Sequence, residues 1–334
     1  MKGENNMSPN PNPLFHFEDA ERIQCKASIM IEGLSGKGKS GLALIIGYFL
    51  AGQDWTKVYH IDTENHSAVL FSDIGASIGG TFGKFKIGNF TPDLGYKPSN
   101  YLAFREAAIT SGAKSVISDS ISHAWMYKGG VLDLLNDAKK SNKRYEKDSY
   151  AAWSDEIVAK EKLAIFDLIR DPRTHIITTV RVKEKLEYGT DDNGKSKMIS
   201  LGDQQIMQGD IKYEPDLVLR MVRPGKSRNG VLTHPSAEVI KSRYAIFTEG
   251  EVYEFTPTLL EQLREYLEDG ISPDELLERQ RLDYVNGIKT YLDTNSNAVP
   301  IWNVLKKDAG YEKTKLDELP LDAIKALFIK LTID

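Results

Sequence analysis

The chain has 334 residues, of which 41% are hydrophobic and 27% are charged, a composition typical of globular proteins that excludes wholesale disorder. The net charge of −5 argues against non-specific polyanion binding by the whole surface, although it leaves room for a local basic groove. No apolar run approaches the ~20 residues of a membrane span, and no apolar segment of a secretory signal is visible. The single cysteine, Cys25, excludes an intrachain disulfide and fits a reducing compartment.

Predicted strands and helices alternate along the first 255 residues. Residues 1–13 are rich in Asn and Pro, and we expect a flexible leader there. The predicted elements are a strand at 23–32, a helix at Leu42–Ala51, a strand at 57–62, a helix at Tyr101–Ser111, a strand at 114–119, a helix at Trp153–Arg170, a strand at 174–182 and β-rich segments at Asp216–Val222, Glu238–Phe247 and Val252–Phe255. This alternation predicts an α/β fold with a mainly parallel sheet and helices on both faces.

The last part of the chain changes to helical patterns. Ser272-Pro273 begins one helix, with Glu275 completing a capping box. The expected helices are 257–268, 273–294, 299–308 and 321–332, and the expected small helical core is Trp302, Leu305, Leu319 and Ile324. Residues 251–334 carry 17 acidic and 10 basic side chains. We therefore predict three parts: the leader 1–13, a core 14–269 and an acidic helical module 270–334, with the boundary near Gly270.

The segment Gly33–Ser40 fits the pattern G-x-x-x-x-G-K-[ST], with an apolar strand before it and an apolar helix after it. Glycines allow successive backbone N–H groups to point at phosphate oxygens, Lys39 reaches the β- and γ-phosphates, and the Ser40 hydroxyl ligates Mg²⁺. We therefore predict that the chain binds ATP and Mg²⁺. The expected nucleotide-binding residues are Gly33, Ser35, Gly36, Lys37, Gly38, Lys39, Ser40 and Gly41.

Two acidic residues follow predicted strands. Asp119 ends the strand at 114–119, where an acid beside a phosphate loop holds Mg²⁺, although a turn cap is the alternative role. Glu64 follows the strand at 57–62, where a carboxylate can orient an attacking water. Taken alone, the position of Glu64 after a strand also fits an acidic side chain in a solvated loop. We predict that Asp119 joins Ser40 at the metal and that Glu64 is catalytic.

These motifs together resemble those of the RecA-fold ATPases, in which a phosphate loop is followed by strands ending in Asp-x-Glu and Asp-Ser. Here these sequences are Asp62-Thr63-Glu64 and Asp119-Ser120. The resemblance implies that Glu64 activates water and that Asp119 is the Walker B acid. It also implies a γ-phosphate sensor at Thr179, where RecA has glutamine, on a strand that leads into a DNA-contacting loop. The fold implied is a RecA-like P-loop NTPase.

Over residues 25–255 the chain is similar to small phage ATPases with a RecA core, the Sak-type single-strand annealing proteins and their AAA-labelled relatives. Their strand after the long loop begins with Tyr-Glu-x-Asp, here Tyr213-Glu214-Pro215-Asp216. The resemblance implies a protein of phage recombination. If it is phage-encoded, its expected location is the cytoplasm of the bacterial host.

Lys241 and Arg243 stand two residues apart on a predicted strand, so their side chains share one face. The pair is similar to the Lys-x-Arg element of DnaB-type helicases, which reaches the γ-phosphate held by a neighbouring subunit, as an arginine finger does in trans. A solvated edge-strand face is the alternative. With the finger role, the active form must be an oligomer with shared ATP sites.

Two stretches after predicted strand ends are expected to form long loops. The first spans 139–147, near Tyr150 and Trp153, and the second spans Lys183–Asp210, with a hairpin or disorder signal at Gly189–Gly194. Cations follow the phosphates of a single strand and rings stack on its bases, whereas the alternative is a solvated flexible surface. The expected DNA-binding residues are Lys139, Lys140, Lys143, Arg144, Lys183 and Lys185.

We therefore expect a DNA-stimulated ATPase that binds single-stranded DNA and promotes annealing or strand pairing as a ring or filament, in the cytoplasm and without a membrane partner. Its expected partners are single-stranded DNA, further copies of the chain and a single-strand binding protein. The alternatives are a DnaB-like ring motor and a nucleotide-gated structural module with little turnover. A small-molecule kinase fits less well, because residues 183–210 lack the arginines of a kinase lid.

Overall fold

The computed structural model describes residues 20–64, 67–71, 84–91, 93–142, 144–145, 148, 150–190, 196–223, 227–228, 231–232 and 234–333. The chain divides into two compact units, one of Lys26–Leu267 and one of Met1–Cys25 together with Glu268–Asp334. Each unit is described by itself. The predicted leader at 1–13 lies outside the described residues.

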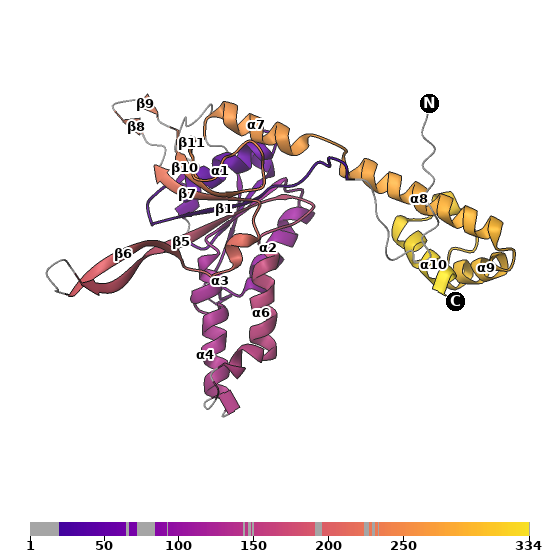
Figure 1. The fold of residues 1–334 in the computed structure, drawn as a ribbon, viewed down its shortest axis with the longest axis horizontal. Helices are drawn as coiled ribbons and strands as arrows, with labels where there is room; N and C mark the ends of the chain where they lie inside the picture. The colour runs from indigo at the N-terminus through magenta and orange to yellow at the C-terminus, as the bar shows by residue number, and fades with distance from the viewer. Residues whose placement is uncertain are drawn as a thin grey trace. The chain divides into compact units, whose positions relative to one another are not determined.

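A nine-stranded sheet forms the centre of the larger unit (Figure 1). Its strands are β1 (Ser28–Gly33), β2 (Val58–Asp62), β3 (Lys86–Asn89), β4 (Ser115–Asp119), β5 (His175–Thr190), β6 (Ser196–Gln205), β7 (Leu217–Arg223), β10 (Ser236–Ser242) and β11 (Val252–Glu254). The order is β11-β10-β7-β1-β5-β4-β2-β3, with β6 paired to β5. Neighbouring strands from β7 to β3 are parallel, whereas β10, β11 and β6 pair in an antiparallel manner.

Helices cover both faces of this sheet. They are α1 (Lys39–Leu50), α2 (Pro98–Thr110), α3 (Ser122–Met126), α4 (Val131–Ser141), α6 (Glu156–Asp167) and α7 (Pro257–Glu268), with single-turn helices η1 (Trp55–Lys57), η2 (Ser67–Phe71), η3 (Ala151–Ser154) and η4 (Ile211–Tyr213). Successive strand residues point to opposite faces, so Ile29 and Ile31 of β1 pack with α1 and α7, whereas Met30 packs with α2, α4 and α6. The predicted α/β class, with helices on both sides of a mainly parallel sheet, is confirmed.

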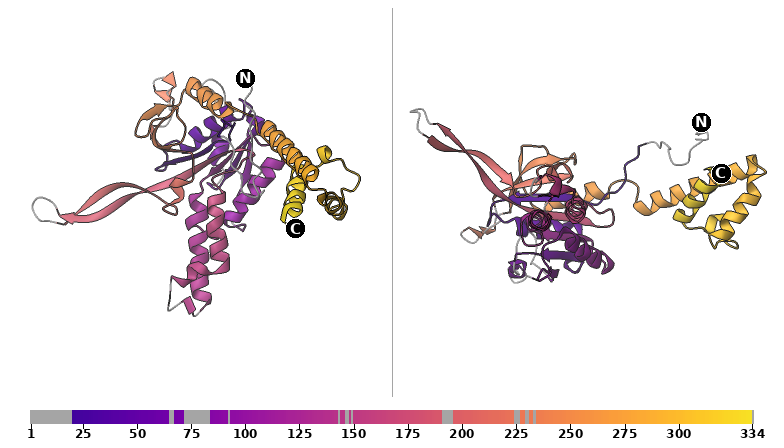
Figure 2. Two further views of the ribbon diagram at one scale, coloured as in Figure 1. Left: turned by 45° about the vertical axis from the view of Figure 1, so that its right-hand side comes forward. Right: turned by 90° about the horizontal axis from the view of Figure 1, so that it is seen from below.

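Two hairpins project from the sheet unit (Figure 1), and Figure 2 shows both from other directions. One is helical and consists of α4 and α6. The other is a two-stranded ribbon: β5 pairs with β1 as far as Arg181 and then, from Val182 to Thr190, pairs only with β6. A separate short pair is formed by β8 (Ser227–Arg228) and β9 (Val231–Leu232).

Both stretches predicted as long loops contain regular structure, although residues 143, 146 and 147 of the first and 191–195 of the second lie outside the described residues. Lys139 and Lys140 belong to the last turn of α4, whose buried residues Val131, Leu135 and Ala138 have a helical spacing that the sequence prediction overlooked. The stretch Lys183–Asp210 consists mostly of the β5–β6 ribbon. Of the two alternatives predicted near Gly189, a hairpin or disorder, the antiparallel pairing of these strands fits the hairpin. Strand pairing satisfies the backbone groups that a loop would leave to water.

The smaller unit contains α8 (Pro273–Thr294), α9 (Ala298–Asp308), the single turn η5 (Leu316–Glu318) and α10 (Leu321–Ile333), which confirms the predicted helices. The Ser272 hydroxyl accepts a hydrogen bond of 3.2 Å from the N–H of Glu275, as expected for an N-cap. The predicted core is also confirmed: Trp302, Leu305, Leu319 and Ile324 belong to one apolar cluster. In the described part of the chain, no helix combines the length and apolarity that a membrane span requires.

The strand predicted at 23–32 is divided between the two units. Only Ser28–Gly33 forms β1, whereas Ile23 makes a parallel bridge to Ile271 in the smaller unit. Gly270 permits this contact because a Cβ there would lie 2.3 Å from the carbonyl oxygen of Arg22, and its φ of 104° also favours glycine. The structure thus joins the segment before β1 to the helical unit.

Candidate nucleotide site

The carboxyl ends of neighbouring parallel strands meet at one edge of the sheet. Asp62 at the end of β2 pairs with Asp119 at the end of β4, and Gly33 at the end of β1 pairs with Arg181 of β5. In open α/β sheets, ligands bind outside this edge. The sheet therefore brings together four functional segments that lie far apart in the sequence.

The phosphate loop follows β1 directly and leads into α1. Gly36 and Gly38 have φ angles of 75° and 88°, which side-chain-bearing residues rarely adopt. No atom of the described residues lies within 4 Å of a Cβ built on Gly36, so the backbone conformation there is what requires glycine. Within the described residues no side chain caps α1, and the first turn of this helix contains no acidic residue. Its first N–H groups are thus available to a phosphate.

Lys39, the first residue of α1, is buried with 7% of its surface exposed. Its ammonium donates hydrogen bonds to the carbonyl oxygens of Gly33 (2.9 Å) and Leu34 (3.1 Å). Burial lowers the pKa of this ammonium, whereas the carboxylates of Asp119 and Glu64 oppose that effect. The lysine thus lies in the loop, close to both predicted acids.

Asp119 is buried at the end of β4, with 1% of its surface exposed. Its Oδ1 accepts a hydrogen bond from the Thr179 hydroxyl, and the His60 Nε2 lies 3.6 Å from its Oδ2. Burial raises the pKa of this carboxyl, but the neighbouring His60 ring and the hydroxyls of Ser40 and Thr179 outweigh burial and lower the pKa to about 2. Asp119 is therefore ionised at neutral pH.

The oxygen donors around Asp119 fit a Mg²⁺ ion. Its Oδ2 is buried and has no hydrogen-bond partner among the described residues, so a cation would satisfy it. Mg²⁺ in nucleotide sites is held by one or two protein oxygens together with phosphates and water. Asp119 and the nearby Ser40 hydroxyl are the residues that would hold it, as the sequence predicts.

Thr179, the predicted γ-phosphate sensor, lies beside Asp119. Its surface is fully buried, and its hydroxyl is engaged by Asp119. In this arrangement the Thr179 hydroxyl contacts the carboxylate of Asp119, and the sensor role of Thr179 stays a prediction.

Glu64 is placed by a turn after β2. Asp62 is buried, and its carboxylate accepts hydrogen bonds from the N–H groups of Glu64 (2.6 Å) and Ala68 (3.1 Å). The Glu64 carboxylate projects from this turn and remains 27% exposed. A carboxylate so placed beside Lys39 and Asp119 has the position expected of a group that orients water.

The sequence prediction missed Arg181. Its Nη2 and Nε lie 2.8 Å and 3.0 Å from the Glu64 Oε1, and its Nη1 lies 3.2 Å from the Tyr127 hydroxyl. Two residues beyond Thr179 on β5, it shares a strand face with that residue. This two-residue spacing from Thr179 could have pointed to Arg181 from the sequence. Its pairing with Gly33, however, depends on how β5 aligns with β1 in the folded protein.

The predicted finger residues Lys241 and Arg243 approach the same segment of the chain. The Lys241 ammonium donates to the carbonyl oxygens of Tyr213 (2.5 Å) and Pro215 (2.6 Å), and the Arg243 Nη1 lies 2.8 Å from the Asp216 Oδ1. Desolvation and the nearby Arg243 guanidinium lower the pKa of Lys241. The two cations therefore share a face of the fold, although Arg243 follows the end of β10 and does not lie on the strand as predicted.

That face lies at the opposite end of the sheet from the phosphate loop. Ser242 of β10 pairs with Leu217, the first residue of β7, and β7 runs parallel to β1. The amino ends of β7 and β1 are thus near Lys241, whereas the phosphate loop follows the carboxyl end of β1. Lys241 and Arg243 are not brought to the nucleotide site of their own chain.

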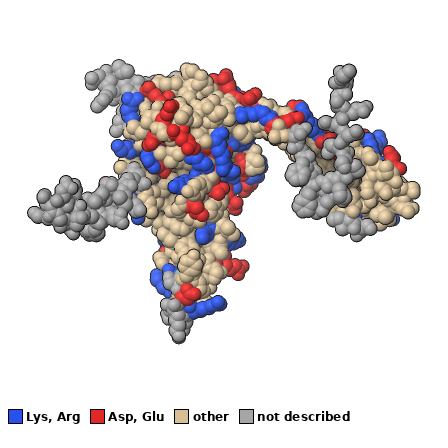
Figure 3. Space-filling model, viewed as in Figure 1, with Lys and Arg blue, Asp and Glu red and all other residues tan. Residues whose placement is uncertain are grey.

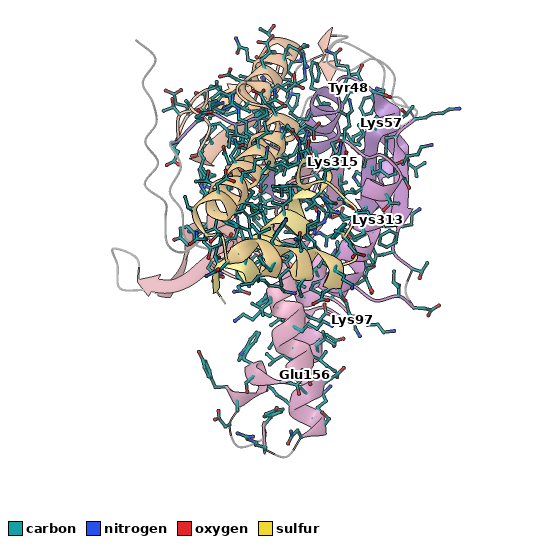
Figure 4. The ribbon with its side chains drawn as sticks, turned by 90° about the vertical axis from the view of Figure 1, so that its right-hand side faces the viewer. Tyr48, Lys57, Lys97, Glu156, Lys313 and Lys315 are labelled. Carbon is teal, nitrogen blue, oxygen red and sulfur yellow. The ribbon has the colours of Figure 1, made fainter. Side chains whose placement is uncertain are left out.

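The predicted DNA-binding residues fall into two groups. Lys140 and Arg144 are exposed near the far end of the α4–α6 hairpin, where Figure 3 shows charges of both signs and Figure 4 labels Glu156. Tyr150 is 85% exposed, whereas Trp153 packs against Trp125, with ring centroids 6.1 Å apart. In the second group, Lys183 is exposed on β5. Lys143 lies outside the described residues, and Lys185 lies in the ribbon, where only the backbone is described.

No curated protein matches the chain significantly. Among solved structures, the KaiC-like protein PH0186 from the hyperthermophilic archaeon Pyrococcus horikoshii OT3 matches with 16% sequence identity and a TM-score of 0.38, over 68% of this chain and 83% of that chain.

The sequence profile of one protein family, described as AAA domain, matches residues 25–251. The match begins before β1 and includes the phosphate loop, both acids and all the parallel strands of the sheet. It covers well over half of the chain. The chain therefore belongs to the AAA domain family, and its larger unit is a P-loop ATPase domain.

Proposed function

We propose that this protein hydrolyses ATP and couples the nucleotide to single-stranded DNA, promoting annealing or strand pairing as an oligomer. The observation that carries the ATPase part is the grouping of Lys39, Asp119 and Glu64 at the carboxyl edge of the sheet. The family supports a P-loop ATPase domain. The DNA and oligomer parts rest on separate features of the fold.

Each residue of the site would contribute one function to hydrolysis. The loop N–H groups and the Lys39 ammonium would bind the triphosphate, and Ser40 with Asp119 would hold Mg²⁺. When bound, Mg²⁺ neutralises charge that develops on the phosphate oxygens. Glu64 would orient a water for in-line attack, and the turn made by Asp62 would keep its carboxylate in place.

The β5–β6 ribbon supports coupling to DNA because it leaves the sheet at the edge that carries the nucleotide site. Gln205 at the end of β6 hydrogen-bonds to Glu32, which directly precedes Gly33. Glu32 is buried and also lies 2.7 Å from Arg220 of β7. The base of the ribbon is thus tied to the strand that holds the phosphate loop, so a shift of the loop would reach the ribbon.

The position of Lys241 and Arg243 supports head-to-tail assembly. Since they lie at the sheet edge opposite to their own phosphate loop, the phosphate within their reach would be one held by a neighbouring chain. Binding it would replace their present contacts with the Tyr213–Asp216 segment. Head-to-tail contacts generate closed rings or open filaments. Either arrangement would complete each ATP site with residues from two chains.

An ATPase assay with and without single-stranded DNA tests this function, together with native mass measurement in the presence of a non-hydrolysable ATP analogue. We expect hydrolysis that rises with DNA and a mass that increases when the analogue and Mg²⁺ are added. A hydrolysis rate that does not change when DNA is added would contradict the DNA part of the proposal. A chain that stays monomeric with the analogue and Mg²⁺ would contradict the oligomer part.

One observation favours a second candidate, a nucleotide-gated module with little turnover. Glu64, the group that should orient water, is engaged in an ion pair of 2.8 Å with Arg181. If the pair persisted with ATP bound, ATP would bind without rapid hydrolysis. Single-turnover measurements distinguish the two, because the module would bind ATP fully and release product only very slowly.

A further inference from the structure

The Arg181–Glu64 ion pair lies at the entrance of the phosphate loop. Arg181 pairs in register with Gly33, the first residue of the loop, and two of its guanidinium nitrogens contact a single carboxylate oxygen of Glu64. Both charges act on the buried Lys39: burial lowers the pKa of the lysine, Glu64 raises it and Arg181 lowers it further. Arg181, Glu64 and Lys39 therefore occupy one small electrostatic environment.

Backbone hydrogen bonds hold Arg181 in the sheet independently of its side-chain contacts. The backbone N–H donates a hydrogen bond of 2.9 Å to the Ser122 hydroxyl, and the carbonyl oxygen accepts a hydrogen bond of 2.8 Å from the N–H of Ile206. The guanidinium also lies 5.9 Å from the centre of the Tyr127 ring. A cation–π attraction to this ring can stabilise the guanidinium while it changes partner. A change of partner thus requires only side-chain rotation.

The ion pair remains open to water. Its side chains are 31% and 27% exposed, so solvent screens part of the attraction between the two charges. A phosphate offers more charge than a carboxylate and accepts the same forked hydrogen bonds from a guanidinium. A terminal phosphate beside Lys39 would therefore compete well for Arg181.

We propose that Arg181 recognises the γ-phosphate and that it leaves Glu64 to do so, which frees the Glu64 carboxylate to orient water. Before ATP binds, Glu64 takes the place of the phosphate as the anionic partner of Arg181. ADP lacks the phosphate that would compete, so the pair stays closed with ADP. The inference rests on the proposed function, since it describes how this ATPase site distinguishes ATP from ADP.

Equilibrium binding of fluorescent ADP and of a fluorescent non-hydrolysable ATP analogue, both with Mg²⁺, tests the inference without requiring turnover. The decisive comparison is between Glu64→Gln and the double variant Arg181→Ala/Glu64→Gln, because both lack the Glu64 charge that would otherwise repel phosphate. We expect the double variant to bind the ATP analogue about tenfold more weakly and ADP equally well. Glu64→Gln alone should bind the analogue more tightly than the wild type.

Arg173→Ala is the matched control. Arg173 precedes the opposite end of β5 and pairs with the partly exposed Glu106 and with the buried Asp171, so its loss should leave the ATP-to-ADP affinity ratio unchanged. Arg181→Lys keeps the charge but loses the paired N–H donors of the guanidinium, so it should give an intermediate ATP-to-ADP affinity ratio. Circular dichroism verifies that each variant is folded.

Equal affinities of the single and double variants for the analogue would overturn the role of Arg181 while leaving the ATPase proposal intact. Failure of the wild type to bind either nucleotide would instead overturn the proposed function itself.

Discussion

Thr63 joins the two strands that carry the acidic residues of the site. Its hydroxyl accepts a hydrogen bond of 2.8 Å from the N–H of Ser120 and lies 2.7 Å from the His123 Nδ1, and its own N–H donates to the carbonyl oxygen of Asp119. The ends of β2 and β4 are therefore held in one register just where Asp119 and Glu64 must act together. At this scale, buried polar contacts rather than surface charges determine the geometry.

Asp62 provides a test of this positioning. Asp62→Asn should lower kcat about tenfold, because the turn loses one of two charged hydrogen bonds that place Glu64, whereas nucleotide affinity should change little. Steady-state ATPase assays and analogue binding measure the two effects. A variant with wild-type kcat would show that the turn does not need the Asp62 charge.

His175 provides a test of stability against pH. It is buried, its Nδ1 accepts a hydrogen bond of 2.9 Å from the N–H of Ala27, and burial lowers its pKa to about 3. The unfolded chain protonates this ring below about pH 6.5, whereas the folded chain does not until about pH 3, so its contribution is fully present above pH 6.5 and is lost as pH falls.

The free energy of unfolding measured in urea should therefore decrease toward acid, and His175→Gln should reduce that slope by about 1.4 kcal/mol per pH unit near pH 5. The amide keeps an acceptor for Ala27 without titrating. A slope identical to that of the wild type would contradict the assignment.

At the scale of elements, the two hairpins carry the DNA proposal. For the helical hairpin, Lys140→Ala/Arg144→Ala should weaken single-strand binding and reduce the slope of log affinity against log salt by about 1.4, since each lost phosphate contact removes about 0.7. The matched control is Lys313→Ala/Lys315→Ala, two exposed lysines of the helical unit labelled in Figure 4. Equal slopes for both pairs would remove α4 and α6 from the DNA surface.

Elements with local signals could be predicted from the sequence, and those set by distant pairing could not. The phosphate loop, Asp119 and Glu64 follow from short patterns next to apolar strands. Arg181 was missed because its role depends on β5 lying beside β1, which aligns Arg181 with Gly33 across 147 intervening residues. A hairpin signal was visible at 189–194, but the length of the ribbon was missed for the same reason, since its charged residues become a strand only when β6 pairs with them.

At the scale of the whole molecule, the opposed positions of the phosphate loop and the Lys241–Arg243 pair predict shared sites. Arg243→Ala and Lys39→Ala chains should each be inactive alone. When they are mixed in equal amounts, about a quarter of the sites combine an intact loop with an intact finger, so about a quarter of wild-type ATPase activity should return. No recovery at any mixing ratio would contradict sharing.

The most direct test of the account is a comparison of ATP hydrolysis and ATP-analogue binding by the wild type, Lys39→Ala and Glu64→Gln in the presence of Mg²⁺. The account predicts that Lys39→Ala loses both properties, because the triphosphate loses its buried cation, whereas Glu64→Gln binds the analogue but hydrolyses ATP at least about a hundredfold more slowly. Wild-type binding by Lys39→Ala, or wild-type turnover by Glu64→Gln, would contradict the claim that this edge of the sheet is an ATPase site.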